Sequence, residues 1–201
     1  MANACRSCLT MKAKYETSAA KAHQLPPMSL PELAFIGRSN VGKSSLLNAL
    51  LNYTGLARTS RTPGRTQMAN FFSVNDSLYF VDLPGYGFAA TGNREHADWQ
   101  ELMDGYLARP VITKFLFLWD PRRDMDDTDF QLALALSQRA PLVLVLTKCD
   151  KVSRGELMQR MRFLENALKS KGVRLVSTHA ISTIKKSGLD ALREELGLAK
   201  P

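Results

Sequence analysis

Short apolar runs recur along the chain, and longer amphipathic segments separate most of them. Each run has the length of a strand and is followed by a turn or a glycine, a pattern typical of strands in an α/β protein. The pattern therefore predicts strands at ELAFIG, ANFFSV, LYFVDL, KFLFLWD, PLVLVLT and RLVSTHA.

The segments between these runs show helical spacing of their apolar residues. Helices are predicted at KSSLLNALLN, WQELMDGYLA, DFQLALALSQR and SGLDALREELG. A longer helix is predicted at RGELMQRMRFLENALKSKG, where Gly172 suits the C-terminal cap. The apolar stripe of this helix, which we expect to pack against the core, consists of Leu157, Met161, Leu164 and Leu168.

The order of the elements predicts the fold class. ANFFSV and LYFVDL are separated only by the short polar turn NDS, so we expect an antiparallel hairpin. The other strands alternate with helices, which implies parallel pairing with helices on both faces. The predicted fold is a three-layer α/β sandwich around a mostly parallel six-stranded sheet with one antiparallel strand. Residues 26–201 are predicted to form one domain, and residues 1–25 a polar tail that is partly disordered.

In such a sheet, ligands bind beyond the carboxyl ends of the strands, so the loops after strands are the places to search. The loop after the first strand, GRSNVGKSS, satisfies G-x-x-x-x-G-K-[ST] and lies between a strand and a helix. This arrangement is a P-loop, in which backbone N–H groups cradle phosphates, the lysine reaches the β and γ phosphates and the hydroxyl binds Mg²⁺. The predicted nucleotide-binding residues of the loop are Gly37, Arg38, Ser39, Asn40, Val41, Gly42, Lys43 and Ser44.

A second loop indicates which base is bound. The strand PLVLVL runs into an [NT]-K-x-D element formed by Thr147, Lys148, Cys149 and Asp150. The Asp150 carboxylate can accept two hydrogen bonds from the guanine edge, whereas adenine offers no such pair of donors, and the Lys148 stem can lie over the ring. In a P-loop chain this element predicts guanine specificity.

A third element, D-x-x-G, ends the third strand. Asp82 is predicted to hold Mg²⁺ through water, and the Gly85 N–H to meet the γ-phosphate, with Leu83 and Pro84 between them. A threonine should complete the magnesium shell in the triphosphate state only. Thr59 and Thr62 compete with Thr66, which is favoured because it lies just before the hairpin.

The formal net charge of +8 favours a polyanionic partner, RNA first, because Lys and Arg release counterions from phosphates. The chain has no apolar run long enough to span a bilayer and no signal-peptide pattern, which predicts a cytoplasmic protein without a membrane partner. Cys5 and Cys8 form only half of a zinc site.

The segments GRSNVGKSSLLNAL, TSRTPGRTQMANFF, VDLPGYGFA, LTKCDK and STIKKSGLDAL, in this order, resemble the EngB (YihA/YsxC) family of ribosome-biogenesis GTP-binding proteins. The resemblance runs from about Tyr15 to the C-terminus. It implies a P-loop NTPase fold of the G-domain type, with a first switch made of Gly64, Arg65, Thr66, Gln67 and Met68, in which Thr66 binds the metal. It also implies guanine contacts, made by the backbone rather than by side chains, from Ile181, Ser182 and Thr183.

Tyr86 follows Gly85 at a position that often holds a water-orienting Gln. Because a phenol cannot replace that amide and no arginine finger is identifiable, we expect slow intrinsic GTP hydrolysis. A partner or a potassium ion at Asn40, as in related GTPases with Asn there, is expected to assist. The residues expected to take part in catalysis are Lys43, Thr66, Gly85 and Asn40.

The resemblance implies a nucleotide-dependent switch in assembly of the large ribosomal subunit, with rRNA and ribosomal proteins as partners and roles in cell division and septation. A monomer is expected. Basic residues near the nucleotide loops would couple RNA contact to nucleotide state, although they equally suit a solvated surface; they are Arg58, Arg61, Arg65, Arg122, Arg123, Lys185 and Lys186. Two alternatives stay open: an RNA-binding module with GTP as a structural ligand, and a small GTPase serving another process.

Overall fold

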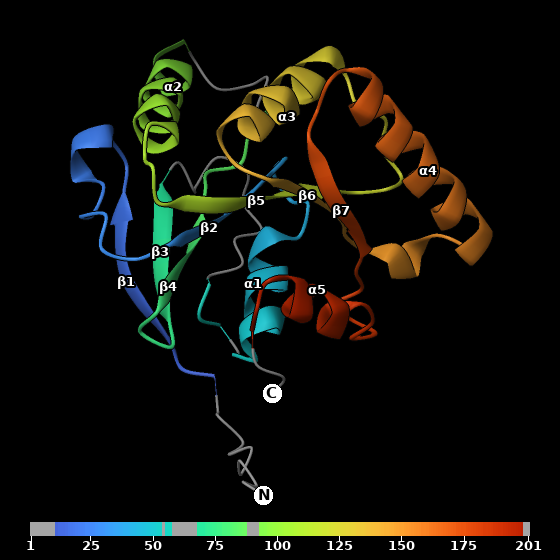
Figure 1. Ribbon diagram of the computed structural model, residues 1–201, viewed down its shortest axis with the longest axis horizontal. Helices are drawn as coiled ribbons and strands as arrows, with labels where there is room; N and C mark the ends of the chain where they lie inside the picture. The colour runs from blue at the N-terminus through green and yellow to red at the C-terminus, as the bar shows by residue number, and fades with distance from the viewer. Residues whose placement is uncertain (1–10, 54, 58–67, 88–92, 199–201) are drawn as a thin grey trace, which may run out of the picture.

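The computed structural model describes residues 11–53, 55–57, 68–87 and 93–198, apart from the side chains of 93–95. Its centre is a seven-stranded sheet with the strand order β1-β3-β4-β2-β5-β6-β7 (Figure 1). The strands are β1 (Ala13–Ala19), β2 (Glu32–Gly37), β3 (Ala69–Val74), β4 (Leu78–Asp82), β5 (Ile112–Trp119), β6 (Leu142–Leu146) and β7 (Leu175–Ala180).

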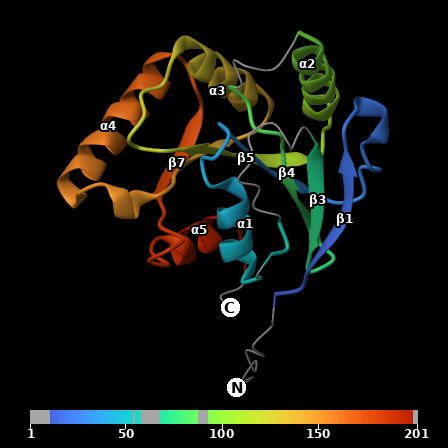
Figure 2. The same ribbon diagram turned by 180° about the vertical axis from the view of Figure 1, so that it is seen from behind.

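Helices cover both faces of this sheet, which confirms the three-layer α/β sandwich (Figure 2). They are α1 (Lys43–Leu51), α2 (Asn93–Leu107), α3 (Asp127–Arg139), α4 (Arg154–Ser170) and α5 (Leu189–Glu195), with short 3-10 turns η1 (Ala22–Gln24) and η2 (Cys149–Lys151). One core lies between the sheet and α2, α3 and α4, and the other between the sheet and α1 and α5. The inner strands alternate between these cores: Leu33 and Phe35 of β2 face α1, whereas Ala34 and Ile36 face the opposite layer.

All six predicted strands and all predicted helices are present. β3 and β4 form the expected antiparallel hairpin, and the pairs β2–β4, β2–β5, β5–β6 and β6–β7 are parallel. In α4, Leu164 and Leu168 are buried, with Leu157 and Met161 packed beside them. Gly172 has a φ of +82°, the left-handed conformation that a helix end requires.

Strand β1 was not predicted, so the expected count of six strands is wrong. Residues 13–24 form β1 and η1 rather than part of a tail, and β1 pairs antiparallel with β3 at the sheet edge. β3 therefore remains the single strand that runs against the others. The segment AKYETSA is mostly polar because an edge strand with exposed side chains needs no apolar alternation. Residues 1–10, with Cys5 and Cys8, lie outside the described part of the chain.

Backbone and side-chain bonds hold this edge in place. Ser18 donates to the Asn70 side chain at 2.6 Å, and Ser73 donates to Glu16 at 2.8 Å.

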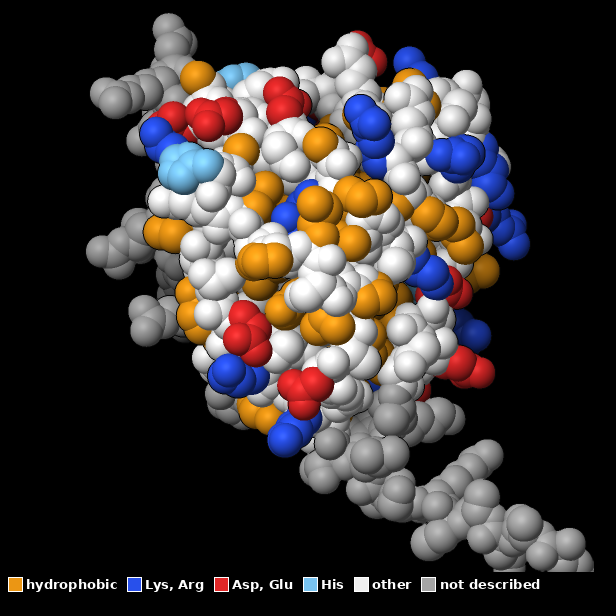
Figure 3. Space-filling model, turned by 60° about the vertical axis from the view of Figure 1, so that its left-hand side comes forward, with side chains coloured by type: hydrophobic (Ala, Val, Ile, Leu, Met, Phe, Trp, Pro, Cys, Tyr) orange, Lys and Arg blue, Asp and Glu red, His pale blue; other side chains and the backbone are white. Residues whose placement is uncertain are grey.

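Figure 3 turns this side of the molecule forward and shows apolar side chains gathered on the face with charged side chains around them. Within the described residues, no helix combines the length and apolar character that a membrane span requires.

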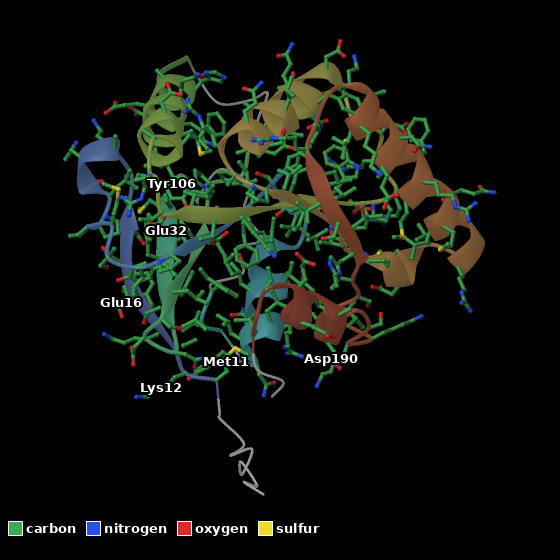
Figure 4. The ribbon with its side chains drawn as sticks, in the orientation of Figure 1. Met11, Lys12, Glu16, Glu32, Tyr106 and Asp190 are labelled. Atoms are coloured by element: carbon green, nitrogen blue, oxygen red, sulfur yellow. The ribbon has the colours of Figure 1, made fainter. Side chains whose placement is uncertain are left out.

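A buried ion pair fixes the end of the sheet opposite the P-loop. Arg109, just after α2, donates to Glu32 at the start of β2, with Nη2 and Oε1 2.5 Å apart, and also to the Pro26 carbonyl at 2.9 Å. Glu32 is fully buried, and Tyr106 of α2 lies beside it (Figure 4). Burial, reinforced by the Glu32 charge, raises the pKa of Tyr106. These contacts tie α2 to β2 and to the N-terminal segment, leaving the other end of the strands for the site.

Candidate nucleotide-binding site

The P-loop connects the end of β2 to the start of α1, as predicted. Gly37 lies so close to β5 that a Cβ there would come within 2.7 Å of the Leu118 carbonyl oxygen, so only glycine fits. Gly42 precedes α1 with φ +112°, and Asn40 has φ 60°. These left-handed residues curl the loop around the N-terminus of α1, where free N–H groups and the helix dipole favour a phosphate.

Lys43 and Asp82 meet beneath this loop. The Lys43 ammonium contacts the Asp82 carboxylate, which is only 3% exposed at the end of β4. Ser44 follows in the first turn of α1 and is half-buried. The P-loop lysine is thereby brought together with the D-x-x-G carboxylate.

The loop after β4 packs directly against the P-loop. A Cβ on Gly85 would lie 2.8 Å from the Ser39 hydroxyl, and the Ser39 N–H donates to the Tyr86 carbonyl at 3.4 Å. On the other side, Trp99 Nε1 of α2 donates a hydrogen bond to the Pro84 carbonyl oxygen at 3.4 Å. Gly85 is therefore held beside the phosphate loop from both sides.

Tyr86 points into the core. Its ring is 7% exposed and stacks on Phe117, with ring centroids 6.2 Å apart. Burial raises the pKa of Tyr86, and the neighbouring Asp129 charge raises it further, so the phenol stays neutral. A neutral phenol packed among core rings does not orient an attacking water, in agreement with the expectation from its sequence position.

The Thr147–Asp150 element is bonded to the P-loop through its first two side chains. Thr147 Oγ1 donates to the Val41 carbonyl at 2.7 Å, and Lys148 Nζ donates to the Asn40 carbonyl at 2.6 Å. Thr147 is 3% exposed. The base-recognition loop and the phosphate loop thus form one hydrogen-bonded unit, as expected if both bind a single nucleotide.

Ser182 positions the Asp150 carboxylate. The Ser182 hydroxyl donates to Asp150 Oδ1 at 2.6 Å, and its own oxygen, Ser182 Oγ, accepts the Lys185 N–H at 3.0 Å. This hydrogen bond lowers the pKa of Asp150 and so keeps it ionised. Ser182 therefore has a side-chain role in addition to the backbone contact with guanine that was expected for it, and that contact stays a prediction. A serine two residues after the end of β7 was the available signal for the side-chain role.

The remaining residues of the two base-side loops have supporting positions. Ile181 is buried, and its carbonyl accepts the Cys149 N–H at 3.1 Å, while Thr183 is half-buried. The Cys149 thiol donates to the Leu146 carbonyl, and burial raises its pKa to about 11. Cys149 is consequently a packed spacer rather than a reactive thiol.

Asp120 was not predicted as a site residue. It follows β5 and is 5% exposed. Its carboxylate accepts a hydrogen bond from Arg122 Nη2 at 2.6 Å and forms an ion pair with Lys148 Nζ at 3.4 Å. Burial would raise the pKa of Asp120, but the Arg122 hydrogen bonds and the Lys148 charge outweigh it and lower the pKa to about 2. A carboxylate directly after an apolar strand, in KFLFLWD, was the signal for it. A small pocket of about 110 Å³ lies between Asp120 and the P-loop.

Part of the predicted site lies outside the described residues. These positions are Gly64, Arg65, Thr66 and Gln67 of the first switch and the basic residues Arg58 and Arg61. Met68 is described, is exposed, and immediately precedes β3. The described residues contain no cluster of three or more His, Cys, Asp or Glu side chains suited to a metal.

A three-layer α/β sandwich with a phosphate loop after β2 and a T-K-x-D element after β6 defines a P-loop GTPase. A family model described as "50S ribosome-binding GTPase" matches residues 32–148. Two relatives, each described as a probable GTP-binding protein EngB, match nearly the whole chain. The protein of Syntrophus aciditrophicus is 45% identical over 177 residues, which are 87% of this chain and 90% of that protein. The protein of Coxiella burnetii (strain CbuK_Q154) is 41% identical over 187 residues, 92% of this chain and 91% of that protein.

The chain therefore belongs to the EngB family of GTP-binding proteins, P-loop GTPases that hydrolyse GTP. Solved structures agree in fold. The crystal structure of a probable GTP-binding protein EngB aligns with a TM-score of 0.61 at 20% identity, over 83% of this chain and 96% of that one. Era in complex with MgGDPNP and nucleotides of 16S ribosomal RNA aligns with a TM-score of 0.64 at 22% identity, over 87% and 59%. The predicted family resemblance is confirmed.

Proposed function

We propose that this protein is a guanine-nucleotide switch with slow, Mg²⁺-dependent GTP hydrolysis that acts in assembly of the large ribosomal subunit. The observation that carries the proposal is the match of residues 32–148 to a model described as a 50S ribosome-binding GTPase. The hydrogen bonds between the Thr147–Asp150 loop and the P-loop support it, because in a switch the base and the phosphates of one nucleotide must be bound together.

Guanine recognition rests on Asp150, ionised and aimed by Ser182. The phosphates lie in the P-loop, where the Lys43 ammonium exchanges its contact with Asp82 for the β and γ oxygens. Gly85 meets the γ-phosphate and Thr66 closes the first switch over it. Hydrolysis then releases both switches.

The residues present fit a magnesium ion. Ser44 offers a hydroxyl and Asp82 a buried carboxylate at the foot of the P-loop, both oxygen donors of the kind Mg²⁺ prefers. Since Mg²⁺ keeps several waters and phosphate oxygens among its ligands, a cluster of three carboxylates is not needed. Thr66 would add a second hydroxyl. When bound, the ion neutralises charge on the phosphates.

We expect slow turnover because the side chain after Gly85, that of Tyr86, is buried in the core and does not order the attacking water. Asn40, which is exposed in the P-loop, would hold a potassium ion, and that ion would supply positive charge near the phosphates. If Asn40→Ala keeps the full stimulation of hydrolysis by potassium, this part of the proposal is wrong.

The partner is the large ribosomal subunit, bound through rRNA and ribosomal proteins. Arg122, Lys185 and Lys186 are exposed beside the base-side loops, where a phosphate backbone would sense the nucleotide state. The chain acts as a monomer in the cytoplasm, and its loss impairs cell division and septation through ribosome supply. Binding of 50S particles that is equal with GDP and with a GTP analogue would refute the switch.

Nucleotide specificity is the first test. Fluorescent GDP and GTP-analogue binding is measured for the wild type and Asp150→Asn, with guanine, adenine and xanthine nucleotides as competitors. The wild type should prefer guanine, and the variant should favour xanthine, because its amide can donate to the xanthine carbonyl; the change in preference should reach about 10³-fold. Equal competition by ATP in the wild type would show that the Thr147–Asp150 loop is misassigned.

Two other functions stay open. An RNA-binding module with GTP as a structural ligand predicts no turnover even with 50S particles and potassium. A small GTPase for another process predicts turnover without nucleotide-dependent binding to 50S particles. The same two assays therefore separate all three.

A further inference from the structure

We propose that Arg38 is a positioning residue for hydrolysis: its guanidinium, held by Asp129, covers the aromatic stack that includes Tyr86 and thereby fixes Gly85 against the P-loop. The inference rests on the GTP hydrolysis of the family. It gives the Arg38 side chain a role other than contact with the phosphates of the nucleotide.

The Arg38 side chain reaches the first turn of α3. Its Nε and Nη2 donate to the two oxygens of Asp129 at 2.9 and 3.0 Å, and Nη2 also contacts Asp126. The Asp129 side chain is fully buried, whereas that of Asp126 is 57% exposed. A planar guanidinium with two parallel bonds to a buried carboxylate is fixed in direction as well as in place.

The same guanidinium covers the aromatic column beneath the loop. Arg38 Cζ lies 5.6 Å from the centroid of the Trp119 ring. Trp119 stacks on Phe117 at 6.3 Å, and Phe117 stacks on Tyr86 at 6.2 Å. Arg38 and Tyr86 also pair as a parallel β-bridge. Arg38 therefore holds the loop after β4 through its backbone and through the stack below its side chain.

Anchoring of Tyr86 decides where Gly85 lies. Gly85 is one peptide away from Tyr86, whose carbonyl accepts the Ser39 N–H, and it packs against the Ser39 hydroxyl. The aliphatic part of the Arg38 side chain also flanks Gly87: a Cβ added at Gly87 would lie 3.6 Å from Arg38 Cγ. If the ring of Tyr86 leaves its pocket, the amide of Gly85 loses its fixed direction, and misplacement by about 1 Å can lower a rate by about 100-fold.

The Tyr86 hydroxyl contributes little to this anchor. It is buried beside Asp129 but makes no hydrogen bond within the described residues. The ring, rather than the hydroxyl, is the anchoring group. Tyr86→Phe and Tyr86→Ala therefore form a matched pair that keeps or removes the ring.

The experiment measures GTP turnover and GDP affinity for the wild type and for Arg38→Gln, Asp129→Asn, the double variant and Asp127→Asn, with a thermal melt of each. Arg38→Gln should lower kcat about tenfold or more, with the Kd for GDP changed by less than about threefold, because geometry and not binding is lost. Asp127→Asn, which alters a carboxylate of the same helix turn that is 90% exposed, should stay within about twofold of wild type.

The double variant separates positioning from folding. Arg38→Gln alone leaves Asp129 buried without a counter-charge and lowers the melting temperature, whereas Arg38→Gln with Asp129→Asn removes both charges and should melt near the wild type. We expect kcat of the double variant to remain low. Its return to the wild-type value would overturn the proposal, since the pair would then serve stability only.

The Tyr86 pair decides the question even if the double variant fails to fold. Tyr86→Phe should keep kcat within about twofold, and Tyr86→Ala should lower it as much as Arg38→Gln. A full loss in Tyr86→Phe, or no loss in Tyr86→Ala, would overturn the anchor. Wild-type protein that binds GDP but never turns over GTP would instead refute the proposed hydrolysis, and the positioning role with it.

Discussion

The base side and the phosphate side of the site are held by different kinds of contact. On the base side, Thr147, Lys148 and Asp150 each have a hydrogen bond of 2.6 to 2.7 Å to a neighbouring loop. On the phosphate side, Lys43 contacts Asp82, and under the proposed function both groups would exchange this contact for a phosphate and a metal ion.

Under the proposed function, this difference allows one site to provide both guanine specificity and nucleotide-dependent switching. Guanine recognition requires donors and acceptors that are fixed before the ligand arrives, because an unpaired polar group then penalises the wrong base. The phosphate side must differ between GDP and GTP, so its charged groups pair in a way that ligands can replace. Changes on the phosphate side should accordingly affect all nucleotides, and changes on the base side should affect guanine above all.

The largest effect is expected for Lys43→Ala. The variant loses the charge that meets the β and γ phosphates, so affinity for GDP and GTP analogues should fall by about 100-fold or more, with no preference among bases. Isothermal titration with guanine and xanthine nucleotides measures this. Lys14→Ala, at an exposed lysine of β1, is the control. An affinity within about threefold of wild type would contradict the assigned role.

A smaller and base-specific effect is expected for Ser182→Ala. The variant removes the 2.6 Å bond that aims Asp150, and the loss of a hydrogen bond to a charged group corresponds to about a tenfold weaker affinity for guanine nucleotides. Competition binding should also show a narrower margin between GDP and ADP. Ser187→Ala is the matched control. Among the described contacts, Ser187 bonds to Ser182 through backbone groups, and alanine keeps these groups. Equal loss in both variants would mean that loop folding, not Asp150, was affected.

The smallest effect is expected for Asp120→Asn, which weakens the support of Lys148. GDP affinity should fall by about threefold, since only a supporting contact is reduced. Because the folded-state pKa of Asp120 is lowered to about 2, its charge stabilises the fold above the unfolded pKa of about 4. The stability difference between wild type and variant should shrink as the pH falls from about 4 to about 2.

Urea unfolding at several pH values measures that difference. Asp124→Asn is the control, because the Asp124 side chain is 79% exposed although it bonds to Arg160. A stability difference between wild type and Asp120→Asn that is constant with pH would contradict the assigned ionisation of Asp120.

The inner strands and the motifs could be read from the sequence for a physical reason. β2, β6 and the last five residues of β5 are buried on both faces, so nearly every residue there is apolar and the runs stand out within a short window. The phosphate loop is recognisable because its chemistry requires glycine and lysine at a fixed local spacing. Such features depend on neighbours a few residues apart, and the sequence lists those neighbours directly.

The tertiary structure alone decided the rest. β1 exists because β3 offers an open edge, which a polar segment can pair with through its backbone. Ser182 reaches Asp150 across 32 residues, and Arg38 reaches Asp129 across 91. Tyr86 has the same identity whether it faces a ligand or the core, and the packing of Phe117 and Trp119 beneath it determines which. The sequence therefore determined six of the seven strands, the nucleotide motifs and the family. The edge strand β1 and the partners of the nucleotide-binding loops depended on contacts between distant segments, which no local pattern encodes.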